Sequence, residues 1–201
     1  MVIGITGGIG SGKSVVSRVL RCNGCRVYDC DSAAKRLMSE SESIRKDIIG
    51  CVGLGAYTDD GNLDKAYLAS KIFNDSDLRL AVNGIVHSAV KKDIERKISE
   101  LFTPFFIESA ILASSGLAEL CEKIWLVDAP FDVRVKRVME RDHLDEEDVL
   151  KRIETQKKES EALPKDKIVI LMNDGTSPLL IKLLENIGKH NNIETLCLKK
   201  F

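Results

Sequence analysis

The sequence predicts an α/β fold, a five-stranded doubly wound parallel sheet with helices on both faces. Five short apolar runs suited to buried strands alternate with segments of helical periodicity, which is the pattern of a parallel sheet. The 201 residues are 44% hydrophobic and 30% charged, enough for one substantial core. Residues 34–100 contain no strong strand candidate, which predicts a helical insertion in the sheet.

The first strand is predicted at Val2–Thr6, and a glycine-rich stretch follows it. Residues 7–14 read G-G-I-G-S-G-K-S and match the phosphate-binding pattern G-x-x-x-x-G-K-[ST] at every fixed position. A helix comes next and is expected to end near Gly24. This order predicts a nucleoside triphosphate site, because the loop turns backbone N–H groups toward phosphate oxygens.

We expect Lys13 to reach the β- and γ-phosphates and the Ser14 hydroxyl to ligate Mg²⁺. The alternative is a glycine turn that binds nothing. A dinucleotide fingerprint is excluded, because Lys13 stands where its third glycine is required. The residues predicted to bind ATP in this stretch are Gly8, Ile9, Gly10, Ser11, Gly12, Lys13, Ser14 and Val15.

The second strand, Cys25–Asp29, ends in two acids, Asp29 and Asp31. Carboxyl ends of parallel strands share one edge of the sheet, so these acids are expected near the phosphate loop. We interpret Asp31 as the group that orients or deprotonates an attacking hydroxyl, and Asp29 as a cap or support. The alternative is that Asp31 or Ser32 only caps the next helix.

Within the insertion, Asp64 is predicted to cap one helix, and a second helix is predicted from about Ile85 to Leu101. His87 lies near the start of that second predicted helix. A histidine there is either a contributor to acceptor binding or, as spacing alone favours, a packed or capping residue.

The third strand is predicted at Phe105–Glu108 and the fourth at Ile124–Asp128. Glu108, at a strand end, is a candidate to support Mg²⁺ through water. Arg137 and Arg141 share a face of the next helix and are either a phosphate clamp or a solvated surface.

A helix break is expected at residues 142–144, followed by a charged helix. That helix is either plainly solvated or part of a closing lid at about residues 141–165. The fifth strand is predicted at Ile168–Met172, then a turn at Asn173–Gly175, then a final helix from Ser177 to Gly188.

Composition excludes several functional classes. The net charge is −1, without the basic footprint of a nucleic-acid-binding protein. Neither a membrane span nor a signal peptide is visible, so the cytoplasm is the expected location. Six cysteines include Cys22 and Cys25 as a C-x-x-C pair, but without further ligands at usual spacing we expect reduced thiols.

Over nearly its full length the chain resembles the dephospho-CoA kinase family. The opening T-G-G-I-G-S-G-K-S is strongly characteristic of that family, and Asp29-Cys30-Asp31 stands where the family has D-A-D. The other matching residues, in order, are Asp60–Lys65, Ile72–Asp75, His87, Ser115–Leu117, Arg137, Arg141, Asp142, Gln156 and Asn173–Gly175.

The resemblance implies a P-loop kinase that transfers the γ-phosphate of ATP to the ribose 3′-hydroxyl of dephospho-CoA, giving coenzyme A and ADP. This is the last step of coenzyme A synthesis. Residues 1–33 and 101–201 would form the nucleotide-binding core, and residues 34–100 would bind the CoA moiety. The implied partners are ATP and dephospho-CoA, with Mg²⁺ as cofactor, no nucleic acid and no membrane. We expect a monomer or a weak homo-oligomer.

The resemblance also assigns roles by position. Asp31 would be the catalytic acid–base residue, and Lys13 and Arg137 would act with it on the γ-phosphate. Arg141 would be a second lid arginine that touches ATP, and Asn173 and Gly175 would lie by the adenine. Asp31, Lys65 and His87 would contact the acceptor.

Three positions depart from the family pattern. His87 is followed by Ser88 instead of proline, Lys65 replaces the usual arginine, and Ser114 replaces a glutamate. These departures leave the ATP side intact and concern acceptor binding.

Three other functions are alternatives. A nucleoside monophosphate kinase would share the loop, lid and sheet, but the long helical insertion favours dephospho-CoA. A GTPase switch would need N-K-x-D, which is absent, and its D-x-x-G matches only the polar stretch Asp47–Gly50. A protein that kept the fold and lost turnover is supported only by Ser114.

Overall fold

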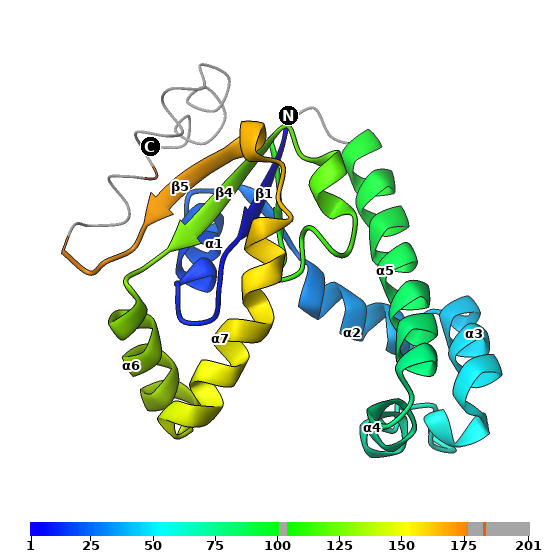
Figure 1. The fold of residues 1–201 in the computed structure, drawn as a ribbon. Coiled ribbons are helices and arrows are strands. Elements are labelled where there is room, and N and C mark those ends of the chain that lie inside the picture. Colours follow the sequence, from blue (N-terminus) through cyan, green and yellow to red (C-terminus); the bar gives the residue numbers. More distant parts are fainter. Residues whose placement is uncertain (101–103, 177–182, 184–201) are drawn as a thin grey trace. The chain divides into compact units, whose positions relative to one another are not determined.

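The computed structural model describes residues 1–100, 104–176 and 183, which form two compact units (Figure 1). The first unit contains residues 1–28 and the described residues after 103, and the second contains residues 29–100. The predicted final helix lies outside the described residues, except for Leu183, which is helical and fully buried.

A five-stranded parallel sheet with strand order β2-β3-β1-β4-β5 is the centre of the first unit. Each strand begins and ends within one residue of its predicted run, so the predicted fold class is confirmed. The strands are β1 (Val2–Thr6), β2 (Arg26–Asp29), β3 (Phe105–Glu108), β4 (Lys123–Asp128) and β5 (Ile168–Met172).

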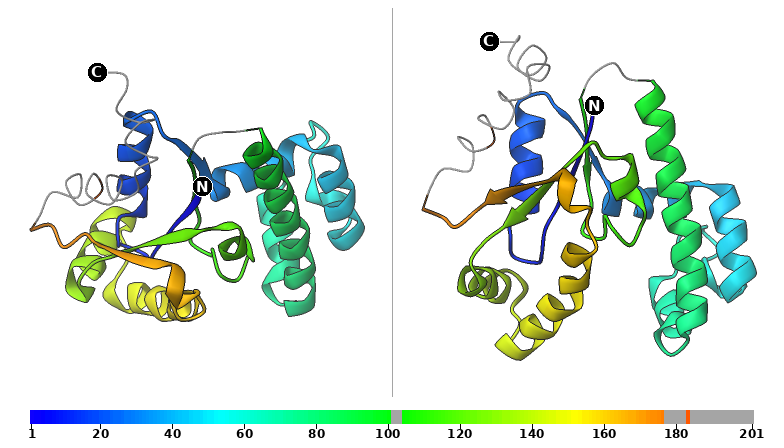
Figure 2. Two further views of the ribbon diagram at one scale, coloured as in Figure 1. Left: turned by 90° about the horizontal axis from the view of Figure 1, so that it is seen from above. Right: turned by 45° about the horizontal axis from the view of Figure 1, so that its top comes forward.

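Helices cover both faces of this sheet (Figure 2). Helix α1 (Lys13–Cys22) packs on one face, where the fully buried Val16 and Trp125 lie in the main core. Helices α6 (Phe131–Asp142) and α7 (Glu146–Glu161) lie on the other face. Alternate residues of a strand point to opposite faces, so a single strand such as β4 contributes to both layers.

The turn between α6 and α7 confirms the predicted helix break. His143 ends α6 in the left-handed region with φ 54°, and the Asp145 side chain caps α7 by accepting from the N–H of Asp148. Val138 and Val149, both fully buried, hold the two helices together.

At the end of α1 the predicted stop is also confirmed, with Asn23 as C-cap and Gly24 at φ 76°. Cys22 is exposed, whereas Cys25 lies in the main core. Burial raises the pKa of the Cys121 thiol to about 12.

The second unit is helical, and its only strand-like feature between residues 30 and 100 is a single bridge from Tyr57 to Leu63. A separate core, which includes Ile48 and Val82, fills this unit. Its elements are α2 (Cys30–Glu40), α3 (Glu42–Val52), the 3₁₀ turn η1 (Leu54–Ala56), α4 (Lys65–Phe73) and α5 (Ser76–Ser99). Two further 3₁₀ turns, η2 (Leu117–Leu120) and η3 (Lys165–Lys167), belong to the first unit.

Asp64 caps α4 as predicted, accepting from the N–H of Tyr67 at 2.9 Å. The predicted start of the longer helix was wrong. Helix α5 begins at Ser76, where Asp75 caps it, so His87 lies in the middle of the helix and not near its start.

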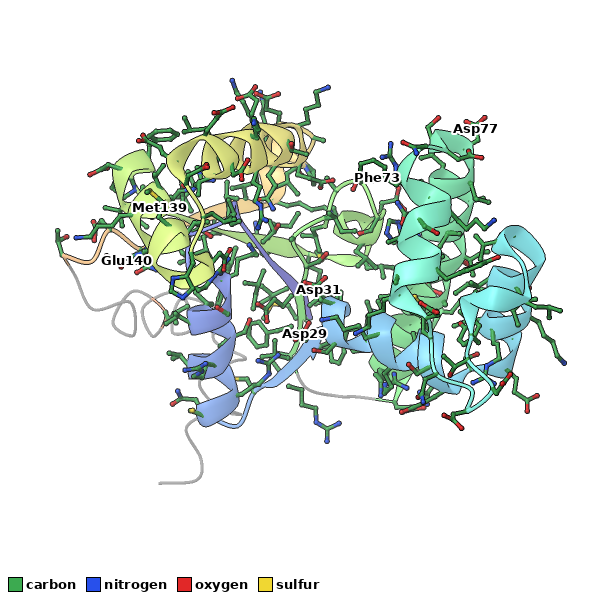
Figure 3. The ribbon with its side chains drawn as sticks, turned by 90° about the horizontal axis from the view of Figure 1, so that it is seen from below. Asp29, Asp31, Phe73, Asp77, Met139 and Glu140 are labelled. Carbon is green, nitrogen blue, oxygen red and sulfur yellow. The ribbon has the colours of Figure 1, made fainter. Side chains whose placement is uncertain are left out.

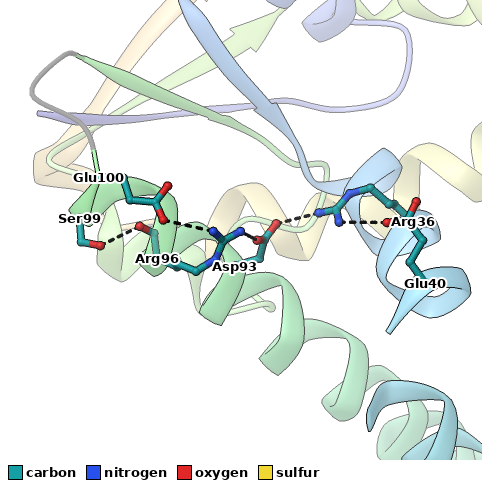
Figure 4. Close-up of polar contacts among 6 residues, drawn as sticks. All are labelled: Arg36, Glu40, Asp93, Arg96, Ser99 and Glu100. Carbon is teal, nitrogen blue, oxygen red and sulfur yellow. Dashed lines mark hydrogen bonds and ion pairs between the residues drawn. The ribbon is translucent and has the colours of Figure 1, made fainter. Parts of the chain in front are cut away.

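An ion-pair network ties α2 to α5 inside the second unit (Figure 4). Asp93 on α5, with a side chain only 9% exposed, accepts from Arg36 of α2 at 2.9 Å and from Arg96 at 2.8 Å. The outer partners Glu40 and Glu100 are exposed. Among the described residues, no helix has both the length and the apolarity that a membrane span needs.

We predict that Asp93→Asn lowers the free energy of unfolding by about 1 to 2 kcal/mol, because it removes a charge and one of two acceptor oxygens at a mostly buried position. Urea denaturation followed by circular dichroism measures this change in the free energy of unfolding. Glu40→Gln is the control and should cost less than about 0.5 kcal/mol, because that carboxylate is solvated. Equal losses in the two variants would contradict a special role for Asp93.

Candidate functional site

The loop between β1 and α1, residues 7–12, forms the tight turn that is typical of a phosphate-binding loop. The N–H of Ser11 donates to the carbonyl of Gly8 at 3.2 Å, and Gly10 and Gly12 adopt φ 78° and 98°, conformations that favour glycine. Helix α1 has neither a side-chain cap nor an acid in its first turn. The positive end of its dipole is therefore left for an anion.

Lys13 lies against this loop. Its Nζ donates to the carbonyl of Gly7 at 2.5 Å and lies 3.5 Å from that of Gly8. Ser14 and Val15, the next two residues, are exposed. Lys13 is thus held at the end of the loop where a terminal phosphate is expected.

The two predicted arginines of α6 differ in what they contact. Arg137 Nη1 donates to the carbonyls of Asn173 at 3.1 Å and Gly10 at 3.4 Å. Arg141 instead forms two hydrogen bonds with Asp142, at 2.7 and 2.8 Å. These bonds lower the pKa of Asp142 and raise that of Arg141. Only Arg137 therefore reaches the loop, although the two share a helix face.

The turn after β5 is fastened to the phosphate loop. The Nδ2 of Asn173 donates to the carbonyl of Ser11 at 2.9 Å, while its backbone N–H donates to the carbonyl of Asp128 at 2.7 Å. Gly175, at φ 82°, completes the turn. Two segments far apart in sequence are thus joined at the predicted nucleotide site.

Two further residues that we did not assign from the sequence also hold the loop. Arg134 on α6 donates from Nε to the carbonyl of Ile9 at 3.0 Å, and Gln156 on α7 accepts from the N–H of Ile9 at 2.6 Å. The only sequence signals were that Arg134 precedes Arg137 by three residues, one helical turn, and that Gln156 matches the family.

A cavity of about 480 Å³ lies beside the loop, between α7 and the sheet. Gly8, Asp128 and Arg134 line one side of it, and Gln156 and Lys157 line the other. Side chains of α7, Gln156 among them, therefore border open space next to the loop.

Glu108 ends β3 as predicted, and its carboxylate forms an ion pair with Arg21 at 3.6 Å. The side chain is only 14% exposed. Its charge is therefore already compensated by a protein cation, which weakens the case for Glu108 as a magnesium support.

In the second unit, Asp29 and not Asp31 or Ser32 caps α2 (Figure 3). Asp29 accepts from the N–H and the hydroxyl of Ser32, at 3.1 and 2.8 Å. Asp31, in the first turn of the same helix, is exposed. The predicted capping role of Asp29 is confirmed, and the alternative that Asp31 or Ser32 is the cap is wrong.

The predicted acceptor residues lie on two helices of this unit. Lys65 is exposed at the first position of α4, and His87 is half-buried on α5. Both sites therefore stay predictions.

A family model described as dephospho-CoA kinase matches residues 1–178. The chain belongs to the dephospho-CoA kinase family. It is 39% identical over 201 residues to a dephospho-CoA kinase of Bacteroides fragilis, covering 98% of this chain and 97% of that protein. A dephospho-CoA kinase of Porphyromonas gingivalis is 46% identical over 160 residues, 79% of each chain.

Solved structures agree with the family at the level of fold. A dephospho-CoA kinase from Campylobacter jejuni superposes with a TM-score of 0.68 at 20% identity, covering 94% of this chain and 98% of that one. A shikimate kinase from Aquifex aeolicus gives a TM-score of 0.51 at 18% identity, over 95% and 98% of the two chains. These likenesses confirm the kinase fold with a five-stranded parallel sheet.

Ser114, where the family pattern has a glutamate, lies opposite a carboxylate from another element. Its backbone N–H donates to Glu159 on α7 at 3.2 Å. Like Ile9, position 114 is thus a point at which a side chain of α7 accepts a backbone hydrogen bond from another segment of the first unit.

We predict that Asn173→Ala weakens nucleotide binding about fivefold, because the carbonyl of Ser11 loses a hydrogen bond worth about 1 kcal/mol. Titration calorimetry with ATP and with inorganic pyrophosphate measures the two dissociation constants. A similar loss for pyrophosphate, which has no adenine, would locate the effect in the loop. Thr176→Ala, at an exposed neighbouring position, is the control, and an equal loss there would contradict the prediction.

Proposed function

We propose that this protein transfers the γ-phosphate of ATP to the ribose 3′-hydroxyl of dephospho-CoA, the last step of coenzyme A synthesis. The family match over residues 1–178 is the observation that carries the proposal. The phosphate loop, with Lys13 and Arg137 held against it, supports the donor half of the reaction.

On the donor side, the loop amides and the start of α1 would bind the phosphates of ATP. Lys13 would move from the carbonyls of Gly7 and Gly8 to the β- and γ-phosphates. Arg137 would stabilise the charge that develops on the transferred phosphoryl group. Arg141 would reach ATP only after giving up Asp142.

On the acceptor side, Asp31 would accept the proton of the 3′-hydroxyl as its oxygen attacks the γ-phosphorus and ADP leaves. Its exposure and its freedom from the capping role that Asp29 performs support this assignment. Lys65 and His87 would contact the rest of the acceptor, and residues 34–100 as a whole would form its binding region.

Magnesium would enter with ATP, where it neutralises charge on the β- and γ-phosphates. Ser14 fits as a ligand, because its hydroxyl is exposed in the first turn of α1. Glu108 fits less well, because Arg21 already pairs with it. We therefore propose Ser14, with the nucleotide itself, as the main source of ligands.

The remaining proposals concern organisation. Residues 1–33 and 101–201 would act as the nucleotide-binding core, with a lid at about 141–165. The proposed location is the cytoplasm, and the proposed state is a monomer or a weak homo-oligomer.

We predict ADP release from Mg·ATP with dephospho-CoA, and none above background with nucleoside monophosphates or shikimate. The reason is that nucleoside monophosphates and shikimate lack the pantetheine part of dephospho-CoA, which residues 34–100 would bind. A coupled ADP assay over this acceptor panel measures it, with Lys13→Ala as the inactive control. Faster turnover of a nucleoside monophosphate would contradict the proposed acceptor.

We predict that Asp31→Asn lowers kcat about 10²- to 10⁴-fold, the usual contribution of a general base. Steady-state kinetics over pH 6–9 measures it. Asp29→Asn is the matched control, two residues away, and should lose stability through its cap while keeping most of kcat. The assignment of the base is wrong if Asp31→Asn turns over at the wild-type rate.

A further inference from the structure

Ile9 is the point at which the phosphate loop is joined to α6 and α7. Its side chain packs against the small core formed by Val135, Val138 and Val149. Its carbonyl accepts from Arg134 of α6, and its N–H donates to Gln156 of α7. Both backbone groups and the side chain of one loop residue are thus bound by the α6–α7 hairpin.

The hydrogen bond from Ile9 to Gln156 differs from the others around the loop. Lys13, Arg134, Arg137 and Asn173 all donate to carbonyl groups of the loop. Gln156 instead accepts from a loop N–H, which is the kind of group that such a loop offers to phosphate oxygens. A carboxamide oxygen at 2.6 Å from this nitrogen occupies the position of an anion oxygen.

We propose that Gln156 is a positioning residue that competes with a phosphate oxygen of the bound nucleotide for the N–H of Ile9. Binding of the nucleotide would then release α7 from the loop, so that the two events are coupled. The inference rests on the proposed triphosphate site but not on the identity of the acceptor.

The packing of α7 is consistent with a small free-energy loss when its contact with the loop opens. Its first half is anchored by Val149, which is fully buried, and by the partly buried Ile153. Its second half borders the 480 Å³ cavity, and there Gln156 and Glu159 accept hydrogen bonds from the backbone N–H groups of Ile9 and Ser114. Next to the cavity, these polar contacts hold α7 to the loop, and a ligand can replace the one to Ile9.

The test is nucleotide binding by Gln156→Ala, measured calorimetrically with the non-hydrolysable ATP analogue AMP-PNP and with inorganic pyrophosphate. Removing the competing oxygen should raise the affinities for AMP-PNP and for pyrophosphate by about two- to tenfold, the range of one net hydrogen bond. Gln156→Glu keeps the shape of the side chain and adds a negative charge that repels phosphate, so it should lower both affinities. Unchanged or weaker binding by Gln156→Ala would overturn the proposal, since that is what a purely supporting residue predicts.

Ile153→Ala is the matched control, because it loosens the same helix and leaves the bond from Ile9 to Gln156 in place. Its affinity for AMP-PNP should rise by less than that of Gln156→Ala, because the competing oxygen is still present. If Ile153→Ala tightens binding as much as Gln156→Ala, general loosening of α7 explains the effect and the competition is overturned. Failure of the wild type and every variant to bind AMP-PNP would remove the proposed triphosphate site as well.

The backbone amide signal of Ile9 in NMR spectra gives a second, direct readout. In the absence of nucleotide it should differ between the wild type and Gln156→Ala, because only the wild type has the carboxamide partner. With saturating AMP-PNP the two proteins should give the same shift, because a phosphate oxygen is then the partner in both. A difference that persists in the complex would show that Gln156 keeps the N–H, and would overturn the proposal.

Discussion

The carbonyl groups of the phosphate loop all accept hydrogen bonds from within the protein. Those of residues 7–11 are bound by the N–H of Ser11 and by the side chains of Lys13, Arg134, Arg137 and Asn173. A peptide group whose oxygen is held on one side presents its N–H on the other. Side chains from α1, α6 and the turn after β5 therefore determine that this loop offers donors, and not acceptors, to a ligand.

Most of the first unit could be predicted because its signals are local. A buried parallel strand such as Ile168–Met172 is a continuous apolar run, and a loop such as residues 7–14 has a fixed spacing of glycines and lysine. The contacts that hold the loop are not local. Arg134 is 125 residues from Ile9 and Gln156 is 147 residues from it. No periodicity connects such positions, so their roles could be seen only in the folded chain.

The error at the start of α5 has a local cause. Gly84 interrupts an otherwise helical stretch, and glycine inside a helix costs about 1 kcal/mol relative to alanine, so the pattern favoured a start just after it. The structure places Gly84 inside the helix, where tertiary packing offsets the cost. Val82 is buried in the core of the second unit, and Ile85 packs against that core. Likewise, the capping of α2 by Asp29 depended on where the helix begins, which sequence patterns give only to within a few residues.

Three glycines of the loop, Gly8, Gly10 and Gly12, leave room for protein groups that bind the loop from outside. A Cβ on Gly8 would lie 2.2 Å from Nη2 of Arg134, and one on Gly12 would lie 2.2 Å from Nδ2 of Asn173. One on Gly10 would lie 2.6 Å from the carbonyl oxygen of Arg134. At Gly10 the neighbour is backbone, so glycine is required there independently of any ligand, whereas a side chain at Gly8 or Gly12 would displace the ends of Arg134 and Asn173 that bind the loop. It follows that α6 and the turn after β5 can approach closely enough to bind the loop carbonyls only because the loop has no side chains there. The glycine pattern that identifies a phosphate loop in the sequence is therefore also the condition for the contacts that keep its N–H groups turned toward the ligand.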